Sequence, residues 1–205
     1  MARLSIFPLA GALLFPRAHL PLHIFEPRYR ALVSDAMARD RRIGMIQPRE
    51  DGKKAALFDV GCVGHISDVE ALPDGRYNIV LEGVTRFQMV RELDVSTAFR
   101  QIEADCGPFA ADSGEASTLA LAIRADVERE ARRFAEARGY AIDWDAVARL
   151  DDESLVNSVS QIAPFDVATK QALLEAPDVA ERADMLAQFL RFSRLDDSDD
   201  DATMQ

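Results

Sequence analysis

A chain of 205 residues, 48% of them hydrophobic and with a formal net charge of −11, can bury one large core or two small ones, which argues against a disordered protein. No apolar run approaches the about 20 residues of a membrane-spanning helix, and the N-terminus lacks a secretory leader pattern, so we expect a cytoplasmic protein without a membrane segment. Cys62 and Cys106 are far apart and neither lies in a CxxC pair, so we expect two buried thiols rather than a disulfide or a zinc ribbon.

The first half of the chain is rich in strand patterns separated by turn residues. Strands are expected at 3–9, 19–24, 42–47, 60–72, 76–84, 87–92 and 98–104. The fourth and fifth flank Pro73-Asp74-Gly75, where Pro presets the turn and Gly accepts a positive φ, so we expect a hairpin there. Six or seven short strands in about 100 residues favour a small barrel or curled sheet.

The segment HLPLHIFEPRYR, residues 19–30, joins a strand directly to a helix. Its apolar residues first alternate with polar ones and then, from Tyr29, follow helical spacing, which predicts a helix near 27–39. Pro27 suits the first helical turn because its missing N–H has no helical partner to lose. Glu26 places a negative charge at the positive end of the helix dipole.

Helical periodicity dominates after a linker that we expect at 107–114. The expected helices are a long one ended by Gly139, a short one opened by Asp143, one capped by Asp151 or Asp152, one over 166–176, and a last one opened by Asp178 and Glu181 as a capping box. Four or five amphipathic helices with short connections predict a compact bundle.

The negative charge lies almost wholly in the second half of the chain. Residues 1–110 carry 14 Arg or Lys and 14 Asp or Glu, whereas residues 111–205 carry 10 and 21. Five aspartates fall within 196–201, and we expect residues 194–205 to form a disordered, solubilising acidic tail.

The order of these features resembles the Lon protease N-terminal, substrate-binding domain family, and in particular free-standing bacterial proteins that consist of that domain alone. The resemblance rests on residues 6–9, 14–16, 20–29 (LPLHIFEPRY), 44–46, 60–64, 74–79 (DGRYNI), 81–87 (LEGVTRF), 171–175 and 178–182. It implies an α+β fold in which a PUA-like β pseudo-barrel is followed by an α-helical bundle. We expect the barrel at 1–108, the bundle at 115–193 and the tail beyond.

The resemblance also implies a non-catalytic module that binds unfolded or extended polypeptide, as an adaptor for proteolysis or quality control with a protease or chaperone as partner. The chain has no GxxxxGK[ST] loop for nucleotide phosphates. Its only lysines are Lys53, Lys54 and Lys170, and none lies in a context that would activate a Ser-Lys pair. We therefore predict no enzyme activity, no catalytic residue and no cofactor.

A metal site is not expected. His19 and His23 are four residues apart, which on a strand separates them by about 13 Å, whereas zinc holds its ligands at about 2 Å. His65, the third histidine, adds no ligand spacing.

Two interpretations of the strand-to-helix junction stay open. In one, Glu26 and Pro27 shape the helix start and Arg28 or Arg86 pairs with Glu26, so that the motif is structural. In the other, Phe25, Arg28 and Tyr29 form part of a groove that binds polypeptide.

An alternative function is RNA binding by a PUA-like module. The segment from Arg28 to Arg42 carries five arginines against Asp35 and Asp40, the one basic patch in the sequence, and a patch beside a barrel can contact phosphates. A solvated helix face explains the same charges, and the acidic balance of the chain argues against nucleic acid. An enzyme of unrecognised type is a third possibility, since a fold does not fix a function.

Overall fold

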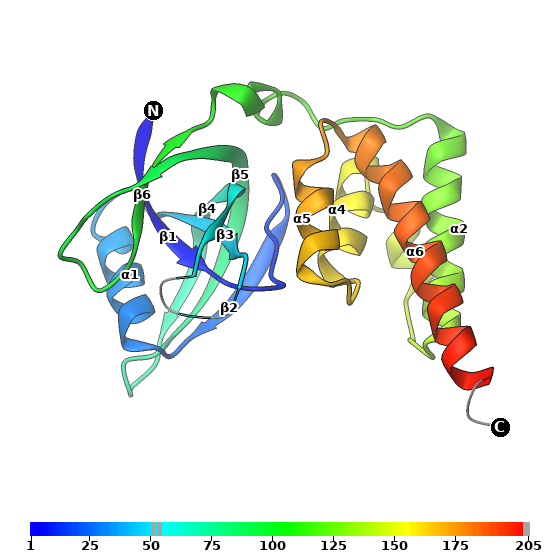
Figure 1. Ribbon diagram of the computed structural model, residues 1–205, viewed down its shortest axis with the longest axis horizontal. Coiled ribbons are helices and arrows are strands. Elements are labelled where there is room, and N and C mark those ends of the chain that lie inside the picture. The colour runs from blue at the N-terminus through cyan, green and yellow to red at the C-terminus, as the bar shows by residue number, and fades with distance from the viewer. Residues whose placement is uncertain (51, 53–54, 203–205) are drawn as a thin grey trace. The chain divides into compact units, whose positions relative to one another are not determined.

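The computed structural model describes residues 1–50, 52 and 55–202, with side chains up to residue 194; Lys53 and Lys54 lie outside these residues. The chain divides into two compact units (Figure 1). The first contains Met1–Glu115 and Phe165–Leu174, and the second contains Ala116–Pro164 and the residues from Glu175 onward. None of the described helices combines the length and the apolar content needed to cross a membrane.

The strands of the first unit form one six-stranded sheet. They are β1 (Ala2–Pro8), β2 (His19–Ile24), β3 (Arg42–Pro48), β4 (Leu57–Ala71), β5 (Tyr77–Glu92) and β6 (Gln101–Asp105), in the order β2-β5-β4-β3-β1-β6. β1 and β3 are parallel, and the other pairs are antiparallel. Because β5 also pairs with β6, the ladder runs from β5 through β4, β3, β1 and β6 back to β5.

The hairpin at Pro73-Asp74-Gly75 is present between β4 and β5. Gly75 has φ +78°, and its N–H donates to the Leu72 carbonyl at 2.9 Å. The expectation of two separate strands at 76–84 and 87–92 is wrong, because β5 is continuous from Tyr77 to Glu92. The β4–β5 ladder shifts register at two places, between Val63 and Gly64 and between Ile66 and Asp68, and such irregularities let a long strand bend without ending.

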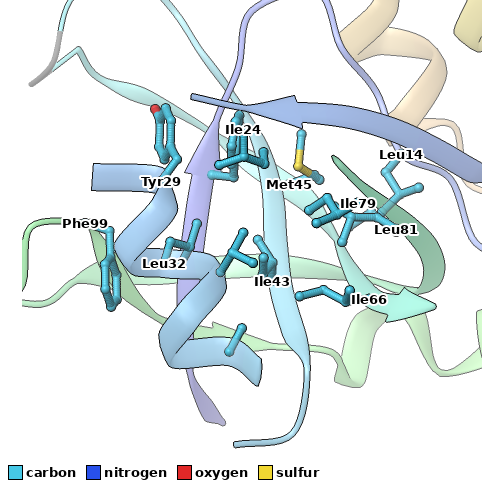
Figure 2. Packing of buried hydrophobic residues seen from close by; sticks show 14 residues of the cluster. Leu14, Ile24, Tyr29, Leu32, Ile43, Met45, Ile66, Ile79, Leu81 and Phe99 are labelled. Atoms are coloured by element: carbon cyan, nitrogen blue, oxygen red, sulfur yellow. The ribbon is translucent and has the colours of Figure 1, made fainter. Parts of the chain in front are cut away.

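The helix that follows β2, α1 (Pro27–Met37), packs one face on the sheet. Its buried residues are Tyr29, Leu32, Val33 and Ala36, the stripe that the sequence predicts, although the helix ends two residues before the expected 39. Figure 2 shows this face with Ile24 of β2, Ile43 and Met45 of β3, and Ile66, Ile79 and Leu81 of the β4–β5 hairpin. Each such aliphatic side chain contributes about 1.5–3 kcal/mol by its burial, so α1 is fixed against the strands.

A short 3-10 segment with a kink at Phe109 and a later α-helix complete the first unit. The expected linker 107–114 is instead a 3-10 helix, η1 (Gly107–Ser113). α5 (Val167–Glu175) is joined to the sheet by buried polar groups: Gln47 Nε2 donates to the Val167 carbonyl and to Gln171 Oε1, both at 3.1 Å, and Gln171 Nε2 donates to the Val60 carbonyl at 3.1 Å. Residues 165–174 therefore group with the strands, which differs from the single bundle expected over 115–193.

The second unit is helical, and aspartates cap three of the helices described there where the sequence predicts. It consists of α2 (Leu121–Ala137), α3 (Trp144–Ala148), α4 (Asp152–Ile162) and α6 (Val179–Ala202). Asp143, Asp151 and Asp178 each accept the N–H three residues later, at 2.9–3.0 Å. α6 continues to Ala202, whereas a disordered tail is expected from 194; residues 203–205 lie outside the description.

Candidate functional site

At the junction between β2 and α1, Phe25 is exposed whereas Tyr29 is buried. Ile24, the last residue of β2, is buried in the core, whereas Phe25, which follows it, is 62% exposed. Glu26 is the N-cap residue, and Pro27 occupies the first turn. The Glu26 side chain makes no capping hydrogen bond, which leaves its carboxylate available to a neighbour.

Tyr29 is buried directly behind this surface. Its ring stacks on Phe7 with the ring centroids 4.0 Å apart, and its hydroxyl donates to the Pro8 carbonyl at 3.1 Å. Burial raises the pKa of the Tyr29 phenol above its usual value, since ionisation would place an anion in a poorly solvated position. Tyr29 therefore holds β1 and α1 together, and only part of its ring reaches the surface.

Arg28 lies between Glu26 and Tyr29. Its Nε donates to Glu26 Oε2 at 3.1 Å, and its guanidinium carbon lies 4.3 Å from the centroid of the Tyr29 ring. The side chain is 28% exposed. Two contacts thus orient a charged group that still reaches solvent.

Two hollows adjoin Arg28. The loop hollow, of about 570 Å³, is bounded by the segment before β6, and the strand hollow, of about 530 Å³, by β2 and the end of β3. Pro8, Arg28 and Tyr29 line both. The loop hollow adds Glu92, Leu93, Asp94, Val95, Thr97, Ala98, Phe99 and Arg100. The strand hollow adds Phe7, Leu9, Ala10, Leu22, His23, Ile24, Phe25, Glu26, Pro48, Glu50 and Gly52.

The structure brings Phe25, Arg28 and Tyr29 together and places Arg86 elsewhere. Of the two arginines considered for Glu26, Arg28 makes the contact, whereas Arg86 binds Asp112 of η1. The sequence does not point to the loop hollow. The signal available was ELDVSTAF, 92–99, a segment between two strands in which Asp94 and Ser96 are turn-forming residues.

The basic patch is partly neutralised by its own helix. Arg28 pairs with Glu26, and Arg39 pairs with Asp35 at 3.1 Å. This pairing lowers the net positive charge that the patch offers to phosphates, so we do not propose RNA binding.

The two cysteines are free thiols, and His23 makes hydrogen bonds to its neighbours. Cys62 is buried as expected, whereas Cys106 is only half-buried. His23 bonds to Asn78 Oδ1 at 2.7 Å through Nδ1 and to Arg76 at 3.2 Å through Nε2. Within the described residues, no group of three or more His, Cys, Asp or Glu side chains could hold a metal ion.

Tyr29→Phe is expected to lower the free energy of unfolding by about 1 kcal/mol at neutral pH, because the Pro8 carbonyl loses its donor. Because the pKa of Tyr29 is raised in the folded protein, it contributes stability that is fully present below the unfolded pKa of about 10. This stability is lost as the pH rises from there through the higher pKa of the folded state. The variant should therefore lose less stability than the parent between pH 8 and 11. Urea denaturation at both pH values measures this, and parallel losses would contradict it.

In comparisons with known proteins, almost the whole chain aligns with one part of longer proteins. The family model for the ATP-dependent protease La (LON) substrate-binding domain matches residues 3–191. Lon protease of Salinispora arenicola is 31% identical over 192 residues, which cover 93% of this chain and 24% of that protein. Lon protease 2 of Herpetosiphon aurantiacus is 28% identical over 198 residues, covering 91% and 23%. The chain thus spans about a quarter of the length of these relatives.

Solved structures show the same fold. The N-terminal domain of Mycobacterium avium complex Lon protease superposes with a TM-score of 0.65 at 20% identity, covering 93% of this chain and 98% of that one. The Lon N-terminal domain protein from Xanthomonas campestris gives a TM-score of 0.66 at 19% identity, covering 91% and 97%. With a family match over residues 3–191, the resemblance noted in the sequence is confirmed, and the chain belongs to the Lon protease substrate-binding domain family.

Proposed function

We propose that this chain is a non-catalytic module that binds unfolded or extended polypeptide in proteolysis or quality control. The observation that carries the proposal is the pair of adjoining hollows around Arg28 and Tyr29, with the exposed Phe25 lining the strand hollow, in a member of a substrate-binding family. Both hollows combine apolar side chains with charged ones, a lining that suits extended chains carrying side chains of varied sequence. A protease or a chaperone is the partner that such an adaptor would serve.

The binding mode that we favour is insertion of side chains into the hollows. The other mode, addition of a strand to the sheet, would use the outer edge of β2, whose pairing with β5 occupies its inner edge. Pro21 lies in the middle of β2 and has no N–H to offer an added strand. Affinity therefore has to come mainly from side-chain burial at Phe25 and its neighbours.

We also assign the first unit to the PUA-like β pseudo-barrels. Support comes from the strand pairings that lead from β5 around to β6 and back to β5. In such a closed arrangement few sheet edges are left exposed. A rigid, closed sheet is a suitable base for hollows that must receive many different chains.

Phe25→Ser is expected to weaken binding of unfolded polypeptide about tenfold, since it removes an apolar side chain that would be buried in the complex. The ligand is a fluorescently labelled, reduced and carboxymethylated protein that cannot refold, and anisotropy gives the dissociation constant. Phe192→Ser is the matched control, because Phe192 is also 62% exposed but lies on α6.

Three outcomes would contradict the proposal. They are the absence of saturable binding by the parent at high micromolar concentration, equal weakening by both serine variants, and binding of RNA, but not of polypeptide, with an affinity that falls steeply with salt. The last outcome would restore the alternative function of the arginine patch.

A further inference from the structure

Arg28 has donors that the protein does not use. A guanidinium carries five N–H groups, one on Nε and four on the two terminal nitrogens. The Nε group donates to Glu26 Oε2. Among the described residues, none accepts a hydrogen bond from the terminal nitrogens of Arg28, and both hollows include this side chain in their lining. The free end of the fork therefore faces the space where a ligand would lie.

The fork is held in one orientation before any ligand arrives. Glu26 fixes Nε, and the Tyr29 ring lies under the guanidinium at 4.3 Å. Tyr29 is itself fixed by Phe7 and the Pro8 carbonyl. A planar donor whose rotamer is already restricted loses less conformational entropy on binding than a free one, so its hydrogen bonds contribute more to affinity.

The charges around the hollows select the acceptor. Among the residues that the structure describes, the lining holds Arg28 and Arg100 against four carboxylates, those of Glu26, Glu50, Glu92 and Asp94. Arg100 already pairs with a carboxylate: three of its five N–H groups donate to the two Glu92 oxygens, at 2.6 and 2.7 Å, and to the Ala55 carbonyl at 2.9 Å. A ligand carboxylate would be repelled by the net negative charge of this lining, whereas an uncharged carbonyl oxygen would not be repelled.

We infer that Arg28 binds main-chain carbonyl oxygens of an extended polypeptide whose apolar side chains enter the two hollows. This inference rests on the proposed function and specifies how it works. Carbonyl oxygens occur at every residue, so Arg28 reads a feature that all unfolded chains share. The hollows then add a preference for apolar side chains on either side of it.

The test uses a peptide of apolar and small residues with both ends blocked, labelled for anisotropy. Arg28→Met keeps the length and packing of the side chain but removes the donors, and it should weaken binding about tenfold. Arg28→Lys keeps the charge without the fork and should weaken it nearly as much. Arg39→Met is the control, since Arg39 is an exposed arginine that pairs with Asp35 away from the hollows, and it should bind as the parent does.

A set of ester peptides identifies the acceptor. Replacing one amide at a time by an ester weakens the preceding carbonyl as an acceptor. One ester should lower affinity for the parent about threefold and leave Arg28→Met unaffected, and this loss of additivity assigns the contact to Arg28. The same peptide with a free C-terminal carboxylate should not bind the parent more tightly.

The outcomes separate the inference from the function on which it rests. If the parent binds the blocked peptide and Arg28→Met binds it equally well, the assignment to Arg28 is wrong while polypeptide binding stands. Tenfold tighter binding of the free carboxylate, lost in Arg28→Met, would show that the fork reads a chain end instead. If the parent binds no peptide at any concentration tested, the proposed function itself fails.

Discussion

Replacing Arg86 with Met is expected to lower the free energy of unfolding by about 3–5 kcal/mol, because it leaves a buried carboxylate without its counter-charge. Arg86 is 4% exposed and Asp112 is 8% exposed. Two parallel bonds join them, Nε to Oδ2 at 3.0 Å and one terminal nitrogen to Oδ1 at 2.9 Å. The other terminal nitrogen donates to the Leu174 carbonyl at 3.1 Å, so one side chain joins β5, η1 and α5.

Urea denaturation followed by far-ultraviolet circular dichroism measures the loss from Arg86→Met. Trp144, the one tryptophan, lies in the second unit, so its fluorescence reports whether the damage stays in the first. The double variant Arg86→Met, Asp112→Leu should recover part of the stability, since no charge is then left buried. A single-variant loss below about 1 kcal/mol would mean that water reaches Asp112 and the pair is not closed.

Gly83→Ala is expected to cost about 3 kcal/mol, the upper part of the range for overpacked sites. A Cβ at this position would overlap the Phe15 carbonyl oxygen and lie 2.7 Å from the Phe15 carbonyl carbon. The chain there has little freedom to move, since the Arg17 N–H donates to the Gly83 carbonyl at 2.8 Å and the Gly83 N–H donates to the Ala18 carbonyl at 2.9 Å. The added methyl group must therefore displace backbone on one side or the other.

Thermal and urea unfolding of Gly83→Ala, compared with Gly107→Ala, measure this cost. Gly107 is exposed, and its added Cβ would meet only the flexible Asp105 side chain, at 3.2 Å, so the control should change stability by no more than about 0.5 kcal/mol. Equal stabilities of the two variants would show that the segment 15–18 can move away from β5.

The parts of the fold that were predictable are those specified by neighbouring residues. The end of β2, the start of α1 and the turn at Gly75 follow from local patterns, and so do the caps at Asp143 and Asp151. The pairing of Arg86 with Asp112 joins residues 26 apart, and the bonds between Gln47 and Gln171 join residues 124 apart. No periodicity signals such contacts, because they depend on how the strands close on one another.

In the candidate site, too, only the residues that are neighbours in the chain were predictable. Phe25, Arg28 and Tyr29 were predictable as a group because they are adjacent in the chain, although their opposite burial was not. Whether they bind polypeptide stays a prediction. The wall of the loop hollow was missed, since Arg100 and Phe99 reach Tyr29 only through the folding of a loop with no repeating pattern.

The return of residues 165–174 to the sheet has a consequence for synthesis on the ribosome. The first unit is complete only when Gln171 and Leu174 have left the exit tunnel, and by then all of Ala116–Pro164 has been made. Before that point the side chain of Gln47 and the carbonyl of Val60 lack the partners that α5 provides. A nascent chain that ends at residue 115 thus has all six strands but lacks α5, and folding of the two units during translation is interleaved instead of sequential.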